Sequence, residues 1–321
     1  FKEYMGGESE VPDLVLDAFG YMYLADNETF AAHLRTNQKL QAALGAGTKI
    51  YTPDEILAAY PFYHIDDLIL GSHNLKDEGY FEGSTMFEWW RRSARKKGAE
   101  YIHNEAIDIQ LNAAGNRAEA VTLSTGEKVS CGTLINAAGP RAAQFASLAN
   151  IPLPIEPRKR FTWIFSAEKP LDRPLPLTID PSGIHIRQYG KNDYMAGSPP
   201  NSDPAAPFDD FEEDHNLWQE HVWPIIAARV PQFEAIRVTS SWAGHYAYNR
   251  LDHNAVLGPH TEIDNFVFAN GFSGHGLQQS PAVGRGIAEL VLYGRYRTLD
   301  LSDFSYQRIE ESRPLLETAI I

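Results

Sequence analysis

The chain has 321 residues, 43% of them apolar, and a formal net charge of −14. This length and apolar content suffice for a large core and about two domains, whereas the acidic balance argues against nucleic acid or an anionic membrane surface as a partner. No segment approaches the roughly 18 consecutive apolar residues that a membrane-spanning helix needs.

The first half of the chain alternates between strand and helix patterns. In chain order, periodicity and turn residues predict a strand (20–25), a helix (28–44), a short helix after Thr52, a strand (67–71), a helix (84–97), three strands (100–111, 118–124 and 128–137) and a short helix (142–148). Gly45 and Gly98 should stop the two long helices, because glycine readily adopts the left-handed conformation that follows a helix. This order is typical of an α/β nucleotide-binding layer.

The second half opens with a proline-rich region that starts at residue 151. It predicts an antiparallel sheet built from strands (160–166, 184–189, 194–197 and 236–242) and one helix (214–229), which Pro224 should kink. From residue 265 the α/β pattern returns, with a strand (265–269), a glycine-rich loop and a helix (281–292). The expected fold class is therefore α/β with α+β character, or mixed α/β.

Cysteine and histidine usage limits the chemistry further. Cys131 is the single cysteine, so no internal disulfide can form, and the 11 histidines are scattered without a metal-ligand spacing. We therefore expect no metal site. The first ten residues resemble neither a signal peptide nor a transit peptide, and we expect a cytoplasmic protein.

The first segment that can carry chemistry is an apolar strand that runs into small residues. Ala137, Ala138 and Gly139 follow Asn136 at the end of this strand, ahead of the short helix. Small side chains there let a planar or phosphorylated ligand approach the backbone. The alternative is a packed turn between strand and helix.

The second segment is a glycine-rich loop between a strand and a helix. It reads Asn270-Gly271-Phe272-Ser273-Gly274-His275-Gly276-Leu277-Gln278-Gln279 and leads into Ser280-Pro281. The glycines allow loop amides to face a ligand, and the helix N-terminus offers unpaired N–H groups with partial positive charge. The alternative is an ordinary glycine-rich turn.

Three polar residues of the sheet domain are candidates for binding a substrate. His245 and Tyr246 lie in the polar, aromatic segment 241–259, which crosses from the sheet domain to the last α/β unit, where ligand sites concentrate. Arg187 lies on a strand, where a guanidinium could pair with a carboxylate. The alternatives are core residues for His245 and Tyr246 and a surface ion pair for Arg187.

These segments resemble the D-amino-acid oxidase superfamily of FAD enzymes, which includes glycine oxidase and sarcosine oxidase. The resemblance rests on Glu156-Pro157-Arg158-Lys159-Arg160, Asp180-Pro181-Ser182-Gly183, Trp242-Ala243-Gly244-His245-Tyr246 and above all the run from Asn270 to Arg285. It implies an incomplete Rossmann-like FAD-binding domain (66–150 and 249–321) interleaved with an antiparallel β-sheet substrate domain (1–65 and 151–248).

The resemblance also implies where FAD would bind. It puts Ala106 and Ile107 by the adenine, and Ala137, Ala138 and Gly139 near the pyrophosphate and ribityl chain. The residues that it implies for the isoalloxazine are Gly271, Ser273, Gly274, His275, Gly276, Leu277 and Gln278.

Three departures from the family pattern shape the expectations. The chain has no Gly-x-Gly-x-x-Gly loop after a strand, so we expect that it lacks the family's opening segment and retains little FAD on purification. The strand 194–197 carries no lysine that could promote reaction with oxygen, which favours a dehydrogenase. Cys131 lies away from the covalent attachment site of sarcosine oxidase-like enzymes, so any FAD should be non-covalent.

The expected function is an FAD-dependent oxidoreductase that oxidises the C–H bond next to the amine of an amino acid or N-methyl amino acid. Arg187, His245 and Tyr246 would bind this small substrate, and the electron acceptor is left open. The alternative is an assembly or interaction protein that keeps the flavoenzyme fold with little turnover. The absent glycine loop and the lack of an arginine beside Tyr246 favour that alternative.

Overall fold

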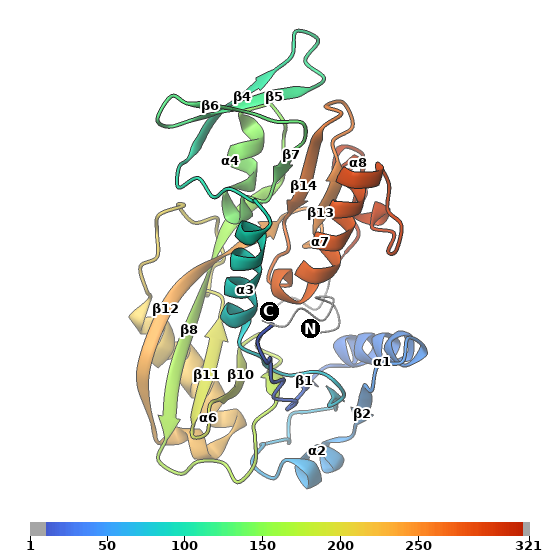
Figure 1. The fold of residues 1–321 in the computed structure, drawn as a ribbon. Helices are drawn as coiled ribbons and strands as arrows, with labels where there is room; N and C mark the ends of the chain where they lie inside the picture. Colours follow the sequence, from blue (N-terminus) through green and yellow to red (C-terminus); the bar gives the residue numbers. More distant parts are fainter. Residues whose placement is uncertain (1–10, 317–321) are drawn as a thin grey trace.

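Three β-sheets organise residues 11–316, the part of the chain that the computed structural model describes (Figure 1). The largest sheet has the strand order β12 (Ile236–Asn249), β8 (Ile155–Ala167), β11 (Asp193–Ser198), β10 (His185–Tyr189), β9 (Leu177–Ile179), β1 (Tyr21–Ala25), β3 (Leu70–Asn74) and β2 (Lys49–Tyr51). The second contains β13 (Val256–Pro259), β14 (Phe266–Asn270) and β7 (Leu134–Asn136), and the third β4 (Ala106–Leu111), β5 (Ala118–Leu123) and β6 (Lys128–Ser130). The fold is mixed α/β, as predicted.

Helices connect and cover these sheets. They are α1 (Glu28–Ala43), α2 (Pro53–Ala59), α3 (Gly83–Lys96), α4 (Ala142–Ser147), α5 (His215–Leu217), the π-helical turn η2 (Trp218–Val222), α6 (Trp223–Arg229), α7 (Gly276–Tyr293) and α8 (Gln307–Glu310), with short 3-10 turns η1 (Gly139–Arg141), η3 (Pro231–Glu234) and η4 (Ser302–Phe304). No helix among residues 11–316 is long and apolar enough to cross a membrane, and in the same range no group of three or more His, Cys, Asp or Glu residues could hold a metal ion.

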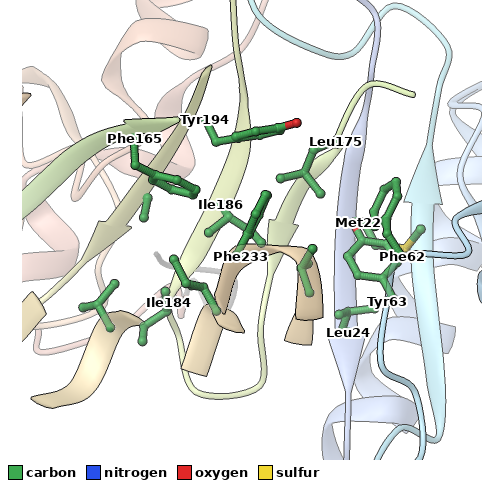
Figure 2. Close-up of a cluster of buried hydrophobic side chains, with 14 of the residues drawn as sticks. Met22, Leu24, Phe62, Tyr63, Phe165, Leu175, Ile184, Ile186, Tyr194 and Phe233 are labelled. Carbon is green, nitrogen blue, oxygen red and sulfur yellow. The ribbon is translucent and has the colours of Figure 1, made fainter. Parts of the chain in front are cut away.

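The largest sheet has two different faces. On one face, side chains from β1, β8, β10 and β11 pack under α5, α6 and η3 in the main core, where Figure 2 shows Phe165, Ile186, Tyr194 and Phe233 among its members. Because neighbouring residues of a strand point to opposite faces, the alternate residues face away from this core. The opposite face therefore carries polar and aromatic side chains, among them Tyr21 and Arg187 (β10).

The second and third sheets lie above the large sheet in Figure 1. In the second sheet β14 and β7 are parallel, so their carboxyl ends meet at one edge. The loops after these two strands are the two segments that the sequence singles out. β3 falls after the boundary expected at residue 66 yet pairs with β1 and β2, so the large sheet takes strands from residues up to 74.

Most predicted elements are confirmed to within a few residues. The strand predicted over 100–111 begins only at Ala106, the strand predicted over 236–242 continues to Asn249, and one strand prediction is wrong. The single strand predicted over 128–137 is two strands, β6 and β7, which belong to different sheets. The Asn265 side chain donates to the carbonyls of Ala118 and Gly132, at 2.7 and 3.0 Å. This bonding turns the chain out of the third sheet at Gly132, so β7 can pair with β14.

Two helix predictions also need correction. The helix predicted over 214–229 is interrupted by the π-helical turn η2 just before Pro224, which has no N–H to continue the α-helical pattern. The last helix starts at Gly276, five residues before the predicted start, and contains Pro281. The carbonyl of Leu277, which Pro281 cannot bond, accepts instead from the Ser280 hydroxyl at 2.9 Å.

Candidate active site

The loop between β14 and α7 has a backbone that only glycine accommodates at two positions. Gly271 and Gly274 have φ values of +73° and +102°. A Cβ atom at Gly271 would lie 2.9 Å from Ile155 Cδ1, and one at Gly274 would lie 2.7 Å from Cε2 of Tyr246. The glycines are therefore required by left-handed conformation and by close packing, and Gly274 brings the loop against the Tyr246 ring.

The N-terminus of α7 offers free hydrogen-bond donors beside this loop. His275 is the N-cap residue, and its side chain makes no capping hydrogen bond. Within residues 11–316, no acceptor takes the backbone N–H groups of Gly276, Leu277 or Gln278. These groups, together with the positive end of the helix dipole, suit an anionic or electron-rich ligand edge.

A buried polar network holds the loop from behind. The backbone N–H of Asn249 donates to Ser273 Oγ at 3.0 Å, and the Asn249 side chain donates to Asp252 Oδ1 at 2.8 Å. Arg308 completes the network with a bidentate pair to Asp252, at 2.8 and 3.2 Å, and both side chains are fully buried. The loop is therefore anchored to α8 and to the end of β12, which keeps the left-handed Ser273 (φ +47°) in place.

A cavity of about 460 Å³ separates this loop from the large sheet, and we call it the loop cavity. Its lining residues come from the loop and the start of α7, from β1 and the segment before it, from β12 and from the turn after β3: Leu16, Tyr21, Tyr23, Asp77, Glu78, Gly79, Phe81, Tyr246, Ser273, Gly274, His275 and Gln278. The predicted site residues Ser273, Gly274, His275, Gln278 and Tyr246 thus meet in one place. Of the other predicted loop residues, Leu277 is half exposed, Gly276 opens α7 and Gly271 packs against Ile155.

Tyr246 and His245 point to opposite faces of β12. The Tyr246 ring lies under the guanidinium of Arg160, 4.8 Å from its centroid, and burial raises the pKa of its hydroxyl. His245 instead stacks on Phe211 at 4.4 Å and bonds the Asp210 carbonyl through Nε2 at 2.8 Å. The structure does not bring His245 into the loop cavity, because successive strand residues alternate between faces.

Arg187 lies on the same face of the large sheet as Tyr21 and Tyr23. Tyr23 and His185 both pair with Ile179 of the intervening β9, so Tyr21 and Arg187 occupy the next row of that face. Arg187 is only 8% exposed, and its guanidinium lies 4.3 Å from the centroid of the Tyr80 ring. Its hydrogen bond goes to the Gln188 carbonyl at 2.8 Å, and no carboxylate among residues 11–316 forms an ion pair with it. Burial lowers its pKa.

Seven lining residues of the loop cavity were missed by sequence reasoning, among them Tyr21, Tyr23 and Glu78. Burial is the main cause that raises the pKa of Tyr21, and the Glu78 carboxylate is the next. Burial also raises the pKa of Glu78 itself. The alternation Tyr21-Met22-Tyr23-Leu24 was a usable signal, since it separates an aromatic face from an apolar one.

A second cavity, of about 770 Å³, lies at the carboxyl end of β7, and we call it the strand-end cavity. Its lining residues are Asn104, Glu105, Ala106, Ile107, Ile135, Asn136, Ala137, Ala138, Arg141, Gln144, Phe145 and Leu148. It brings together four of the residues predicted for the adenosine and pyrophosphate side of FAD. Gly139 (φ +56°) follows in η1 and is not among the lining residues.

Hydrogen bonds between the ends of β7 and β14 connect these two strands at the edge of the strand-end cavity. Asn270 donates to Asn136 Oδ1 at 3.2 Å, and the same oxygen accepts from the N–H of Ala138 at 3.1 Å. The Oδ1 atom of Asn270 is buried without a partner among the described residues. Free N–H groups at α7, an unpaired buried oxygen and small residues at the strand ends fit a large ligand with both polar and planar parts, as FAD is.

Comparisons with known proteins agree with this arrangement. The model of the family described as FAD dependent oxidoreductase matches residues 7–290. The FAD-dependent oxidoreductase domain-containing protein 1 of Xenopus laevis is 36% identical over 96% of this chain and 67% of its own length, and that of Bos taurus is 34% identical over 95% and 69%.

Solved structures show the same fold. The L-proline dehydrogenase from P. horikoshii superposes with a TM-score of 0.83 at 24% identity, covering 98% of this chain and 81% of that chain. The glycine oxidase from Geobacillus kaustophilus superposes with a TM-score of 0.76 at 21% identity, covering 95% and 77%.

Proposed function

This chain belongs to the family of FAD-dependent oxidoreductases, and we propose that it oxidises the C–H bond next to the amine of an amino acid or N-methyl amino acid. The observation that carries the proposal is Arg187. A buried guanidinium with no ion-pair partner among residues 11–316 is costly to fold unless an anion binds it, and a substrate carboxylate would do so. It shares a sheet face with Tyr21 and Tyr23, which line the loop cavity, although Arg187 itself is not among the lining residues.

Different residues of this chain would bind the flavin and orient the substrate. The free N–H groups of Gly276, Leu277 and Gln278 would hold the electron-rich edge of the isoalloxazine. When bound, FAD supplies the acceptor for the hydride that leaves the C–H bond. Arg187 would fix the substrate carboxylate, and the Tyr246 hydroxyl would donate a further hydrogen bond from β12. Non-covalent binding is consistent with the position of Cys131, which packs beside α4 and the second sheet, away from the loop cavity.

We further propose that the protein passes its electrons to an acceptor other than oxygen. A lysine near the flavin would stabilise negative charge that develops on oxygen during its reduction. The residues that line the loop cavity include no lysine. The strand β11, which faces the cavity side of the sheet with Met195 and Gly197, carries none either.

The test is reduction of the bound flavin in the absence of oxygen. The chain loaded with FAD is mixed anaerobically with sarcosine, N,N-dimethylglycine or glycine, and the absorbance of oxidised flavin is followed. We expect bleaching by at least one N-methyl amino acid, and reoxidation that is faster with an artificial dye than with oxygen. A flavin that stays oxidised with every amine would contradict the proposed reaction, and rapid reoxidation by oxygen would contradict the dehydrogenase assignment alone.

A further inference from the structure

We propose that Glu78 binds the ammonium group of the substrate, with the rings of Tyr21, Tyr23 and Tyr246 around its alkyl substituents. This inference rests on the proposed function and narrows the substrate class to N-alkylated amino acids that bind as zwitterions. Glu78 would hold the cationic end and accept its N–H proton before the hydride leaves the neighbouring C–H bond, and Arg187 would hold the carboxylate end. The contacts of Glu78, Tyr21 and Tyr23 do not follow from the sequence segments that identify the family.

Glu78 is held rigidly at the rim of the large sheet. Its carbonyl accepts from the N–H of Gly20 at 3.0 Å, and its Oε2 accepts from the N–H of Tyr21 at 3.3 Å. The next residue, Gly79, permits this turn, because a Cβ atom there would lie 1.9 Å from the Asp17 carbonyl oxygen. The carboxylate is therefore pre-positioned at the start of β1, where it lines the loop cavity.

Glu78 and Arg187 are two opposite charges that do not neutralise each other. Glu78 is half-buried, and no Lys, Arg or His of residues 11–316 forms an ion pair with it. Tyr21 lies within the electrostatic influence of both groups. The Tyr21 strand β1, whose first N–H bonds Glu78, and the Arg187 strand β10 are separated only by β9, so these two strands lie roughly 10 Å apart. An α-amino acid between the two groups could bond one charged end to each, which would compensate the buried charge of Arg187 and the half-buried charge of Glu78.

Aromatic rings surround the space next to the Glu78 carboxylate. Tyr21, Tyr23, Phe81 and Tyr246 all line the loop cavity. Aromatic faces attract cations, and they do so without hydrogen bonds. A primary ammonium would leave N–H donors unsatisfied against these rings, whereas an alkylated ammonium places methyl groups there. The chemistry of the cavity therefore favours a secondary or tertiary amine over a primary one.

A pair of non-oxidisable ligands tests this proposal without turnover. Trimethylammonioacetate carries a permanent positive charge and no lone pair on nitrogen, and 3,3-dimethylbutanoate has the same shape without the charge. Titration calorimetry of the 321-residue chain with excess FAD should give an affinity for trimethylammonioacetate about ten- to a hundredfold higher than for 3,3-dimethylbutanoate, the range expected for a charged contact. Glu78→Gln should abolish this preference.

Asp77→Asn is the matched control, since it removes the neighbouring carboxylate of the same cavity, from an exposed side chain. Asn tolerates the left-handed backbone of Asp77 (φ +56°), and we expect the preference to stay within about twofold of wild type. Equal affinities for the two ligands in the wild-type chain, or an unchanged preference in Glu78→Gln, would overturn the proposal. A preserved preference together with a flavin that no amine reduces would instead refute the proposed function and leave the binding site standing.

Discussion

The loop cavity and the strand-end cavity differ in what supports their walls. Behind the loop cavity lies a pair, Asp252 and Arg308, with both side chains at 0% exposure. The strand-end cavity has the ion pair of Arg141 with Asp209, whose side chain is 92% exposed. Its strand β7 has three residues and one strand neighbour, and Ile135 on that strand is 42% exposed.

The difference suits the two cavities to different tasks: rigid walls can hold reacting groups in position, whereas less rigid walls can still accommodate a ligand by shape. Chemistry on a substrate requires side chains held to a fraction of an ångström, and the buried network around Asp252 provides that rigidity for the loop cavity. A nucleotide half can be bound through backbone and shape, for which small residues at strand ends suffice. Under the proposed function, the residues of the chain would therefore specify the reactive end of the site more tightly than the other end.

The largest expected effect comes from breaking the support of the loop cavity. Asp252→Asn leaves the buried Arg308 without its counter-ion and should lower the free energy of unfolding by about 3–5 kcal/mol. Asp209→Asn removes the corresponding pair beside the strand-end cavity and should change it too little to measure. Urea denaturation of both variants measures the difference, and similar losses would show that the two supports are equivalent.

A smaller effect is expected from adding one methyl group to the loop. Gly274→Ala pushes against the Tyr246 ring, so kcat/KM for the best amine should fall about a hundredfold, as expected for a misplacement of the order of 1 Å. Gly294→Ala is the control at the other end of α7. It also has a left-handed backbone (φ +69°), but nothing lies within 4 Å of its added Cβ. Equal losses in the two variants would mean that backbone strain, not the contact with Tyr246, is responsible.

Removal of a single hydroxyl allows two tyrosines on the same face of β12 to be compared. Tyr246→Phe should leave FAD bound and raise KM about ten- to a hundredfold, because one hydrogen bond to a charged substrate is lost. Tyr248→Phe lies on the same face two residues along, but its hydroxyl bonds His253 Nε2 at 2.7 Å. KM should be unchanged in that variant, and steady-state kinetics would remove Tyr246 from the site if its own variant behaved the same way.

The smallest effect concerns acid stability of the large sheet. Burial and the charges of Arg187 and Arg160 lower the pKa of His185 to about 4. Between pH 6.5 and about 4, His185 is protonated in the unfolded chain but not in the folded chain. The free energy of unfolding should therefore decrease as the pH is lowered, by up to about 1.4 kcal/mol per pH unit. His185→Gln should flatten this slope, and His103→Gln, at an exposed residue, should not. Urea denaturation at pH 7 and 5.5 measures this change in the free energy of unfolding for the wild-type chain and both variants.

The predictable parts of the fold are those with local signals. Gly45 and Gly98 end their helices in left-handed conformations, and Thr52 forms a capping box with Glu55 at the start of α2. The division of residues 128–137 into two strands depends on the side chain of Asn265, which is more than 130 positions away. No local pattern contains that information.

The candidate site was predictable where backbone chemistry defines it. Glycines and a helix N-terminus mark the loop in the sequence, and small residues mark the end of β7. By contrast, the role of Glu78 and the separation of His245 from Tyr246 depend on strand register and on which sheet face is covered. Alternation fixes which residues share a face, but only the packing of α5 and α6 decides which face becomes core.

The central claim is that this chain breaks a C–H bond next to a substrate amine. The direct measurement is anaerobic stopped-flow reduction of the FAD-loaded chain by N,N-dimethylglycine, with hydrogen or deuterium on every carbon bonded to nitrogen. We expect the flavin absorbance to bleach, and to bleach several-fold more slowly with the deuterated amine. Absence of bleaching would contradict the account and favour a binding or assembly role, and bleaching at equal rates with both amines would contradict C–H cleavage as the step that reduces the flavin.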